Sequence, residues 1–179
     1  DLDAPVKDTI HAVARAIGKD VSEITVAILD RERHETLKKE VRATGARLQL
    51  FTDGDVAAAI ATCLPESPVD ILLGIGGSSE AVLAAAALKT LGGELLTRWK
   101  PKDEKHIARL NAAGITKFDD IMKAEDLAKG DDLTFTATGV LEGPLAKGVV
   151  FARNHITTHT IVISSKSKTI RFIETRHHE

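Results

Sequence analysis

The sequence predicts an α/β fold in which βαβ units form a mostly parallel or mixed sheet, with helices on both faces and antiparallel strands added later. Three observations support this fold class. Short apolar runs alternate with helical segments as far as residue 91. After residue 130, threonine alternates with apolar residues, as in strands with one exposed face. The chain has 179 residues, of which 43% are hydrophobic, so it can bury a core.

The first half of the chain repeats the order strand, then helix. Pro5 suits a first helical turn, whereas Gly18 and Gly45 suit helix ends. Apolar runs between these turns read as buried strands. The expected helices cover about residues 5–17, 31–44, 53–63 and 81–91, and the expected strands cover residues 24–29, 47–51 and 69–73.

The second half has shorter connections between its expected strands, which is typical of antiparallel pairing. A charged helix is expected over residues 102–113, and short helical pieces are expected within residues 118–129. Residues 165–168 read as a hairpin loop, and residues 177–179 read as a solvated tail. The expected strands here cover residues 94–99, 133–138, 148–152, 157–164 and 169–174.

Composition excludes several classes of protein. The net charge of −2 argues against a nucleic-acid partner or an anionic membrane surface. Cys63 is the only cysteine, which rules out an internal disulfide and a cysteine-rich zinc site. No apolar run approaches the ~18 residues of a membrane span. We therefore expect a cytoplasmic protein without nucleic-acid or membrane partners. The start at Asp1, without methionine, reads as an internal boundary of a longer protein.

The stretch from Gly74 to Glu80 is the strongest candidate for a functional loop. It follows an apolar strand and opens an alanine-rich helix, so its backbone N–H groups can approach an anion such as phosphate. Glu80 would repel that phosphate unless a divalent cation lies between them. The loop matches neither a dinucleotide fingerprint, which needs glycine where Ser79 stands, nor a Walker motif. It therefore predicts phosphate together with a metal ion.

Two other expected strands also end in polar residues. Arg31 and Arg33 follow the first strand and could bind phosphate oxygens, although they could equally be solvated. Asp53 and Asp55 follow the second strand and could bind sugar hydroxyls or a metal, although capping of the next helix would also explain them. Because the carboxyl ends of parallel strands meet at one edge of a sheet, all three segments are expected to face one crevice.

Together these segments resemble the class II fructose-1,6-bisphosphatases, whose relatives include dual fructose/sedoheptulose bisphosphatases. The resemblance spans nearly the whole chain and rests on four segments in the same order, namely Leu29–His34, Asp53–Ala58, Gly74–Val82 and Phe135–Val140. It implies a phosphatase of gluconeogenesis or a sugar-phosphate cycle that uses Mg²⁺ or Mn²⁺ to release the 1-phosphate of a sugar bisphosphate. By position, Glu80 matches a metal ligand, and the substrate-binding segments match Arg31, Glu32, Arg33, Asp53, Gly54, Asp55 and Gly77.

The resemblance also implies that this chain is incomplete. The family carries most of its acidic metal ligands in an amino-terminal half, and the motif that holds them is absent from these 179 residues. We therefore expect residues 1–179 to be the carboxyl-terminal domain, inactive alone, which needs the missing half as a partner and forms a homo-oligomer. Ser78 and Ser79 stand where the family usually has Ala-Pro, so the loop and the preferred sugar can differ.

Two other functions remain open at this point. A haloacid-dehalogenase-like phosphatase would use Asp53 as its nucleophile and Asp55 as its acid/base. In such an enzyme the nucleophile should follow the first strand, and a Thr or Val is usual where Ala57 stands. A non-catalytic module could use the same crevice to bind a sugar phosphate without hydrolysing it.

Overall fold

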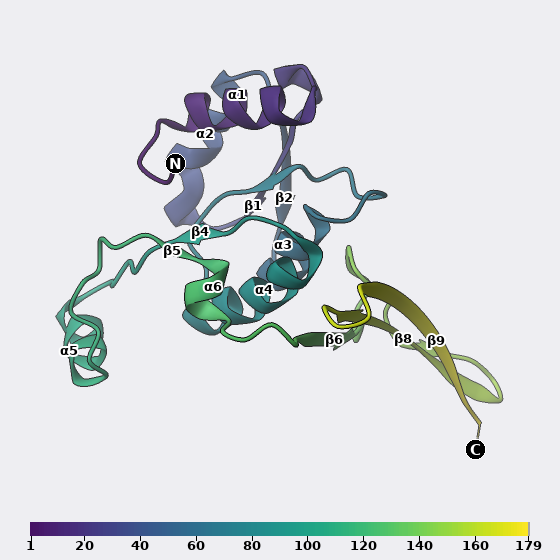
Figure 1. The fold of residues 1–179 in the computed structure, drawn as a ribbon. Coiled ribbons are helices and arrows are strands. Elements are labelled where there is room, and N and C mark those ends of the chain that lie inside the picture. The colour runs from purple at the N-terminus through teal and green to yellow at the C-terminus, as the bar shows by residue number, and fades with distance from the viewer. Residues whose placement is uncertain (179) are drawn as a thin grey trace.

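Strand β1 (Thr25–Leu29) forms the centre of the first sheet. In this computed structural model, which describes residues 1–178, all five β1 residues are buried, as expected of a central parallel strand. β1 pairs in parallel with β2 (Arg47–Phe51) on one side and with β3 (Ile71–Leu72) on the other. The strand order is therefore β2-β1-β3, and the expected βαβ arrangement is confirmed (Figure 1).

Helices cover both faces of this sheet, as the sequence predicted. Helices α1 (Val6–Ile17) and α2 (Glu35–Ala43) pack on one face. Helix α3 (Asp55–Ala61) packs on the other and lies below β1 and β2 in Figure 1. The side chains that make these contacts are Ile10, Val26, Ile28 and Val41 on the first face, and Ala27 and Ala61 on the second.

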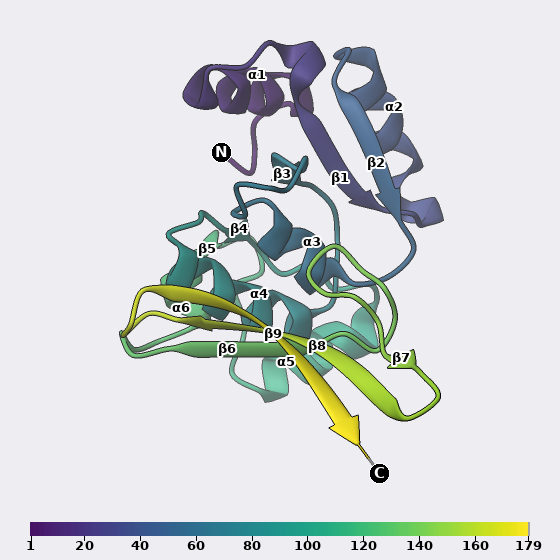
Figure 2. The same cartoon turned by 90° about the vertical axis from the view of Figure 1, so that its right-hand side faces the viewer.

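A second, antiparallel sheet packs against the outer side of α3 and α4 (Ser78–Leu91). Its long central strand β8 (His155–Ser164) pairs with β9 (Thr169–His178) on one edge and with two shorter strands on the other. These shorter strands are β6 (Thr134–Thr138) and β7 (Val150–Phe151). One buried cluster joins Ile60 of α3 and Ala87 of α4 to Phe135, Ile161 and Ile163 of the sheet. The fold thus has four layers, helix, sheet, helix and sheet (Figure 2).

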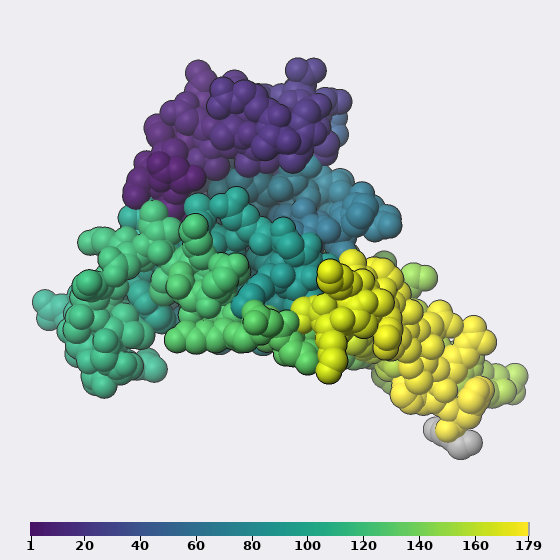
Figure 3. All heavy atoms as spheres, viewed as in Figure 1, coloured from purple at the N-terminus to yellow at the C-terminus, as the bar shows by residue number. Residues whose placement is uncertain are grey.

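The remaining elements lie at the margin of this body. Strand β4 (Leu96–Thr97) pairs with β5 (Met122–Lys123), and α6 (Ala124–Leu127) packs on α4 through Ala124. Helix α5 (Glu104–Ala112) buries none of its residues and projects to one side, while the end of β9 extends to the other side (Figure 3). No helix within residues 1–178 has the length and apolar character needed to cross a membrane.

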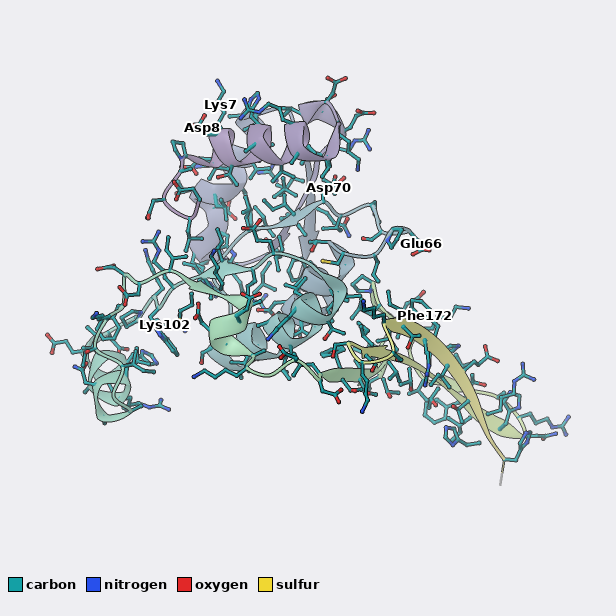
Figure 4. The ribbon with its side chains drawn as sticks, in the orientation of Figure 1. Lys7, Asp8, Glu66, Asp70, Lys102 and Phe172 are labelled. Atoms are coloured by element: carbon teal, nitrogen blue, oxygen red, sulfur yellow. The ribbon has the colours of Figure 1, made fainter. Side chains whose placement is uncertain are left out.

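Several expected boundaries were wrong. The strand expected over residues 69–73 is limited to Ile71 and Leu72, although the Asp70 and Leu73 N–H groups also donate to the Thr25 and Ala27 carbonyls of β1. The Asp70 carboxylate accepts hydrogen bonds from the Thr25 amide and Lys19 (Figure 4). The helix expected from residue 31 begins instead with the 3₁₀ turn η2 (Glu32–His34). A further 3₁₀ turn, η1 (Val21–Glu23), precedes β1.

Three regions of the second half also differ from expectation. The strand expected over residues 94–99 is only β4, and the region expected to hold short helical pieces contains strand β5 as well as α6. His177 and His178, expected in a solvated tail, belong to β9, and the His177 ring lies 3.0 Å from the Thr158 hydroxyl. Glu179 lies outside the described residues.

Candidate functional site

The candidate site lies where the chain changes direction at the carboxyl edge of the first sheet. After β1 the chain passes to α2 on one face, whereas after the adjacent β3 it passes to α4 on the other. Two neighbouring strands whose connections diverge in this way form a topological switch point, where open α/β sheets bind ligands. The segments that follow β1, β2 and β3 are the three in which the sequence analysis placed its candidate residues.

The glycine loop after β3 leads into the start of α4 without a side-chain cap. Gly77 is the residue before the helix and provides no side-chain cap, whereas the Glu80 N–H interacts with its own carboxylate. The N–H groups that precede Glu80, at the positive end of a helix of 14 residues, can donate to an anion. Gly74 has φ of 143°, a conformation that side chains rarely adopt, so glycine is required where the loop leaves the strand.

Two carboxylate groups lie very close to the backbone of the other two glycines of this loop. A Cβ atom added at Gly76 would lie 2.6 Å from Asp55 Oδ2, and one added at Gly77 would overlap Glu80 Oε2. Both acids are half-buried. Only glycine leaves room for the Asp55 and Glu80 carboxylates beside the backbone, so the loop sequence is matched to the acids around it.

The charge of Glu80 is stabilised within the loop. The Ser79 hydroxyl donates to Glu80 Oε2 at 2.8 Å and, together with the Glu80 backbone N–H, holds the pKa of Glu80 below its ordinary value. Partial burial and the negative charge of Asp53 act in the opposite direction. Asp53 is thus close enough for its charge to act on Glu80, and the structure brings Asp53, Asp55 and Glu80 to the same loop.

Asp53 and Asp55 do not cap α3 with their side chains. The residue before α3 is Gly54, which has the left-handed φ of 89°, and Asp53 Oδ1 accepts the Gly54 N–H at 2.9 Å. Asp55 is the first helical residue, where its negative charge interacts favourably with the positive end of the helix dipole. A helix cap therefore does not account for these two acids, although the dipole does contribute to the place of Asp55.

The two arginines link the strand ends to one another. Arg31 donates to the Asp30 carbonyl at 3.0 Å and to the Thr52 carbonyl at 2.7 Å, which joins the ends of β1 and β2. Arg33 donates twice to the Ile75 carbonyl, from Nε at 3.2 Å and from a terminal nitrogen at 2.6 Å. Both arginines are exposed but make these hydrogen bonds to the protein, so they are not merely solvated, and Glu32 between them is also exposed.

The comparison with known proteins decides the family. A family model described as bacterial fructose-1,6-bisphosphatase, glpX-encoded, matches residues 1–177. The chain belongs to this family. The resemblance found in the sequence is thereby confirmed, and the α/β architecture agrees with it.

Curated relatives are about 40% identical to the chain over the aligned residues. The class 2 fructose-1,6-bisphosphatase of Haemophilus influenzae is 39% identical over 191 aligned residues, covering 99% of this chain and 57% of that protein. Fructose-1,6-bisphosphatase 1 class 2 of Escherichia coli K12 is 40% identical, covering 99% of this chain and 56% of that protein. The chain thus spans little more than half the length of the bisphosphatases that it matches.

The bisphosphatase family is metal-dependent, and the acids at the loop fit that requirement in kind but not in number. Carboxylate oxygens are the ligands that Mg²⁺ and Mn²⁺ prefer. Within residues 1–178, however, no three His, Cys, Asp or Glu side chains are placed to hold one ion together. The carboxylates of this half are therefore part of a ligand set at most.

Sequence reasoning missed one buried histidine at this site. His34 is 1% exposed, and its ring joins the Leu29 carbonyl to the Ile75 amide, at 2.7 and 2.9 Å respectively. It lies directly after Arg33, at the end of a segment that the sequence analysis had quoted for its arginines. A histidine in the first turn after a buried strand was the available signal.

A buried lysine was also missed. The Lys38 side chain is 4% exposed, yet its ammonium group contacts Asp30 and lies 2.6 Å from Glu35 Oε1. The hydrogen bond and the positive charge of Lys38 hold the pKa values of Asp30 and Glu35 below their ordinary values. This cluster joins Asp30, the first residue after β1, to helix α2.

Proposed function

We propose that this chain supplies the substrate-binding segments and one metal ligand of an enzyme that hydrolyses the 1-phosphate of fructose 1,6-bisphosphate in cytoplasmic sugar-phosphate metabolism. One observation carries the proposal: in a chain of this family, an uncapped helix start, a glycine loop and three carboxylates meet at the switch point of the sheet. Sedoheptulose 1,7-bisphosphate is proposed as a second substrate, because it presents the same terminal phosphate chemistry.

Each candidate residue has a role that its position supports. The amide of Gly77 and the first N–H groups of α4 receive a phosphate group. Arg31 and Arg33 stand at the same edge with guanidinium groups that can share their remaining N–H donors with phosphate oxygens. The segment formed by Glu32, Asp53, Gly54 and Asp55 orients the sugar through its polar groups.

Glu80 is proposed as a ligand of Mg²⁺ or Mn²⁺. Its lowered pKa keeps the carboxylate ionised, as metal binding requires. A divalent cation bound there would polarise phosphoryl oxygens and lower the pKa of an attacking water. Because the described acids do not form a complete ligand set, the remaining ligands are assigned to the segment of the relatives that lies outside the match. The isolated chain is therefore expected to be inactive.

Exposed apolar residues agree with such a missing partner. Phe151 is 78% exposed and Phe172 on β9 is 65% exposed, in a protein that has few aromatic side chains (Figure 4). Phe151 pairs with Ile156 and Phe172 pairs with Ile161, which places the two rings on opposite faces of the second sheet. Exposed large apolar side chains are typical of surfaces that another part of a protein covers. We propose that the remaining segment packs here, and that the completed protein forms a homo-oligomer.

The haloacid-dehalogenase-like alternative has less support. Its nucleophile should follow the first strand, at the centre of the sheet, whereas Asp53 follows the edge strand β2 and bonds to the Gly54 N–H. The family match also points to a different class of phosphatase. A module that binds without hydrolysis would use the same residues, so only an activity measurement separates it from the proposed enzyme.

The test measures phosphate release from fructose 1,6-bisphosphate with Mg²⁺ or Mn²⁺. The samples are the chain alone and the full-length protein, meaning this chain joined to the remaining segment that its relatives carry. We expect activity only in the full-length protein. Glu80→Gln should lower it by more than about a hundred-fold, since groups that merely support metal ligands are already worth about 10–100-fold.

Glu66→Gln is the matched control, because Glu66 is an exposed acid in the loop before β3 (Figure 4). It should leave both activity and metal dependence unchanged. Full activity of Glu80→Gln would disprove the ligand assignment. Substrate binding without phosphate release in the full-length protein would instead favour the non-catalytic module, and a trapped aspartyl phosphate at Asp53 would favour the haloacid-dehalogenase-like mechanism.

A further inference from the structure

The ring of His34 connects two strands that diverge at the switch point. Its Nδ1 atom lies 2.7 Å from the carbonyl oxygen of Leu29, the last residue of β1. Its Nε2 atom lies 2.9 Å from the backbone nitrogen of Ile75, in the loop after β3. The contact to Leu29 spans 5 residues of sequence and is buried, whereas the contact to Ile75 spans 41 residues and is partly buried. The histidine itself is 1% exposed.

The partners of His34 fix the proton on its ring. A carbonyl oxygen can only accept a hydrogen bond, so Nδ1 must carry the proton toward Leu29. A backbone N–H can only donate, so Nε2 must present its lone pair to Ile75. Both partners are backbone groups that cannot exchange these roles, and a doubly protonated ring would set one N–H against another. The arrangement therefore needs the neutral, Nδ1-protonated histidine.

The neighbouring peptide group of the loop, on the other side of the Ile75 Cα atom, is held by an arginine. Arg33 donates from Nε and from a terminal nitrogen to the Ile75 carbonyl, while His34 accepts the Ile75 N–H. Consecutive residues of η2 thus hold both polar groups of Ile75. A Cβ atom at Gly74 would lie 3.1 Å from His34 Cε1, which shows how closely the loop backbone approaches the ring.

We propose that His34 is a positioning residue for the phosphate-binding loop: with Arg33 it holds the two peptide groups that flank Ile75 and so fixes the backbone amides that follow, from Gly76 to the start of α4. This inference rests on the proposed function, because it assigns those amides to a phosphate. His34 itself does not reach the substrate, being buried behind the loop. His34 contributes by orienting the backbone N–H groups of the loop toward the anion site before the anion binds.

Three variants of the full-length protein separate this role from simple packing. His34→Gln keeps one donor and one acceptor on a side chain that is long enough to accept the Ile75 N–H. His34→Asn has the same groups on a shorter side chain, which can reach Leu29 but not Ile75. His34→Leu removes both. We expect KM for fructose 1,6-bisphosphate to rise at least about ten-fold in His34→Asn and His34→Leu, and to stay within about three-fold in His34→Gln, because misplaced groups of about 1 Å cost up to 10²-fold.

Lys38→Met is the matched structural control. Lys38 is equally buried on the same segment, but its partners are Asp30 and Glu35 rather than the loop. Its replacement should lower the melting temperature and leave KM unchanged. A purely structural role of His34 would give the same pattern for His34→Leu, with less folded enzyme and an unchanged KM, and that result would overturn the proposal. If His34→Leu does not fold, the pair His34→Asn and His34→Gln decides the question.

A second readout does not depend on activity. In the full-length protein, ¹⁵N NMR of the ring should show the neutral Nδ1-protonated form, with the Ile75 amide hydrogen-bonded to Nε2. Exchange of the Ile75 amide with solvent should be at least about ten-fold faster in His34→Asn than in His34→Gln, as expected when an amide loses the hydrogen bond that protects it. A ring protonated at Nε2, or equal exchange in both variants, would overturn the proposal.

The two readouts also separate this inference from the proposed function. If the wild-type full-length protein does not hydrolyse fructose 1,6-bisphosphate, the proposed function fails while the NMR measurement still tests the role of His34. Inorganic phosphate then serves as the probe, and its dissociation constant should rise at least about ten-fold in His34→Asn. Unchanged phosphate affinity in that variant would overturn the positioning role.

Discussion

At the start of α4, the Glu80 carboxylate occupies the space that a side chain at position 77 would need. Gly77 has φ of −81° and ψ of 153°, which any residue can adopt, so its backbone conformation does not require glycine. The requirement comes from the side, because a methyl group at this position would overlap Glu80 Oε2. The size of the side chain at position 77 therefore determines where the Glu80 carboxylate can lie.

The first prediction concerns Gly77→Ala in the full-length protein. The added methyl group should turn the Glu80 carboxylate away from the loop and lower metal-dependent phosphate release by about ten-fold or more, as loss of a metal-supporting contact does. Stability should change by no more than about 1 kcal/mol, which is the usual cost of alanine before a helix. A metal titration of the activity, together with thermal unfolding, measures both effects.

Gly143→Ala provides the control for an added methyl group. A Cβ atom at Gly143 has no heavy atom within 4 Å, and its φ is not positive. This variant should keep the activity and metal requirement of the wild type. Equal loss of activity in Gly77→Ala and Gly143→Ala would contradict the steric explanation.

The junction of β1 and α2 is stabilised by charge. Lys38 on α2 reaches Asp30 after β1 and Glu35 at the start of the helix, and its own pKa is raised by these two hydrogen bonds. The lowered pKa values of Asp30 and Glu35 mean that the ionised carboxylates stabilise the folded state above their ordinary pKa values of about 4. That stabilisation is lost as the pH falls through the lower folded values.

A second prediction follows for Lys38→Met. The free energy of unfolding of the wild type should fall more steeply below about pH 4 than that of the variant, because the variant has no ammonium group to favour the ionised acids. At the alkaline end, the contribution of Lys38 is lost only above its ordinary pKa of about 10.4. Urea unfolding at several pH values measures both limbs.

Lys39→Met serves as the control, because Lys39 is the exposed neighbour of Lys38 on the same helix. Its pH profile should run parallel to that of the wild type. If the free energy of unfolding of Lys38→Met falls as steeply below about pH 4 as that of the wild type, Lys38 does not lower the pKa values of Asp30 and Glu35.

The elements that the sequence predicted well were those whose signal is local. The apolar run of β1 was expected at residues 24–29 and found at Thr25–Leu29, because a continuous buried strand needs no knowledge of its partners. The glycine loop was found for a similar reason, since three glycines at a strand-to-helix turn are visible in the sequence. Strand β3 was overestimated, since only Ile71 and Leu72 are in register with β1, while Asp70 and Leu73 each add a single backbone hydrogen bond to it.

The part of the site that was missed depends on contacts distant in the sequence. The hydrogen bonds of His34 and Arg33 to Ile75 join residues 41 and 42 positions apart, and both end on backbone atoms. A hydrogen bond to a backbone atom leaves no signal in the sequence, because residues of every type have a backbone and the partner can therefore be of any type. The grouping of Asp53, Asp55 and Glu80 was predictable only through the parallel sheet, which brings the ends of separate strands to one edge.

Across the whole molecule, helices α3 and α4 form a layer shared by both sheets. Ile60 of α3 is completely buried in the cluster that includes Ile161 of the second sheet, while the next residue, Ala61, contacts Ala27 of the first. Each sheet therefore depends on the same two helices for one of its covered faces. A defect in this layer should weaken both sheets together.

The third prediction is that Ile60→Ala lowers the free energy of unfolding by about 2–5 kcal/mol, the range for large-to-small changes in a core. Far-ultraviolet circular dichroism and hydrogen exchange in both sheets should report the loss in one transition. Ile17→Ala is the control, since Ile17 at the end of α1 is 49% exposed and should change stability far less. Loss of protection in the second sheet alone would contradict the shared layer.

The hairpin of β8 and β9 sets the order in which the chain can gain structure. Its ten paired positions join residues that are close in the sequence, whereas β1 and β3 meet only after two helices and a strand intervene. Closing a short loop costs less entropy, and a hairpin forms in about 1–10 μs. We expect transient pairing of β8 with β9 to precede the meeting of β1 with β3, although β1 is synthesised earlier. One edge of β1, a strand whose five residues are all buried in the folded protein, thus stays unpaired until β3 arrives, and an unpaired apolar strand edge is prone to aggregation during folding.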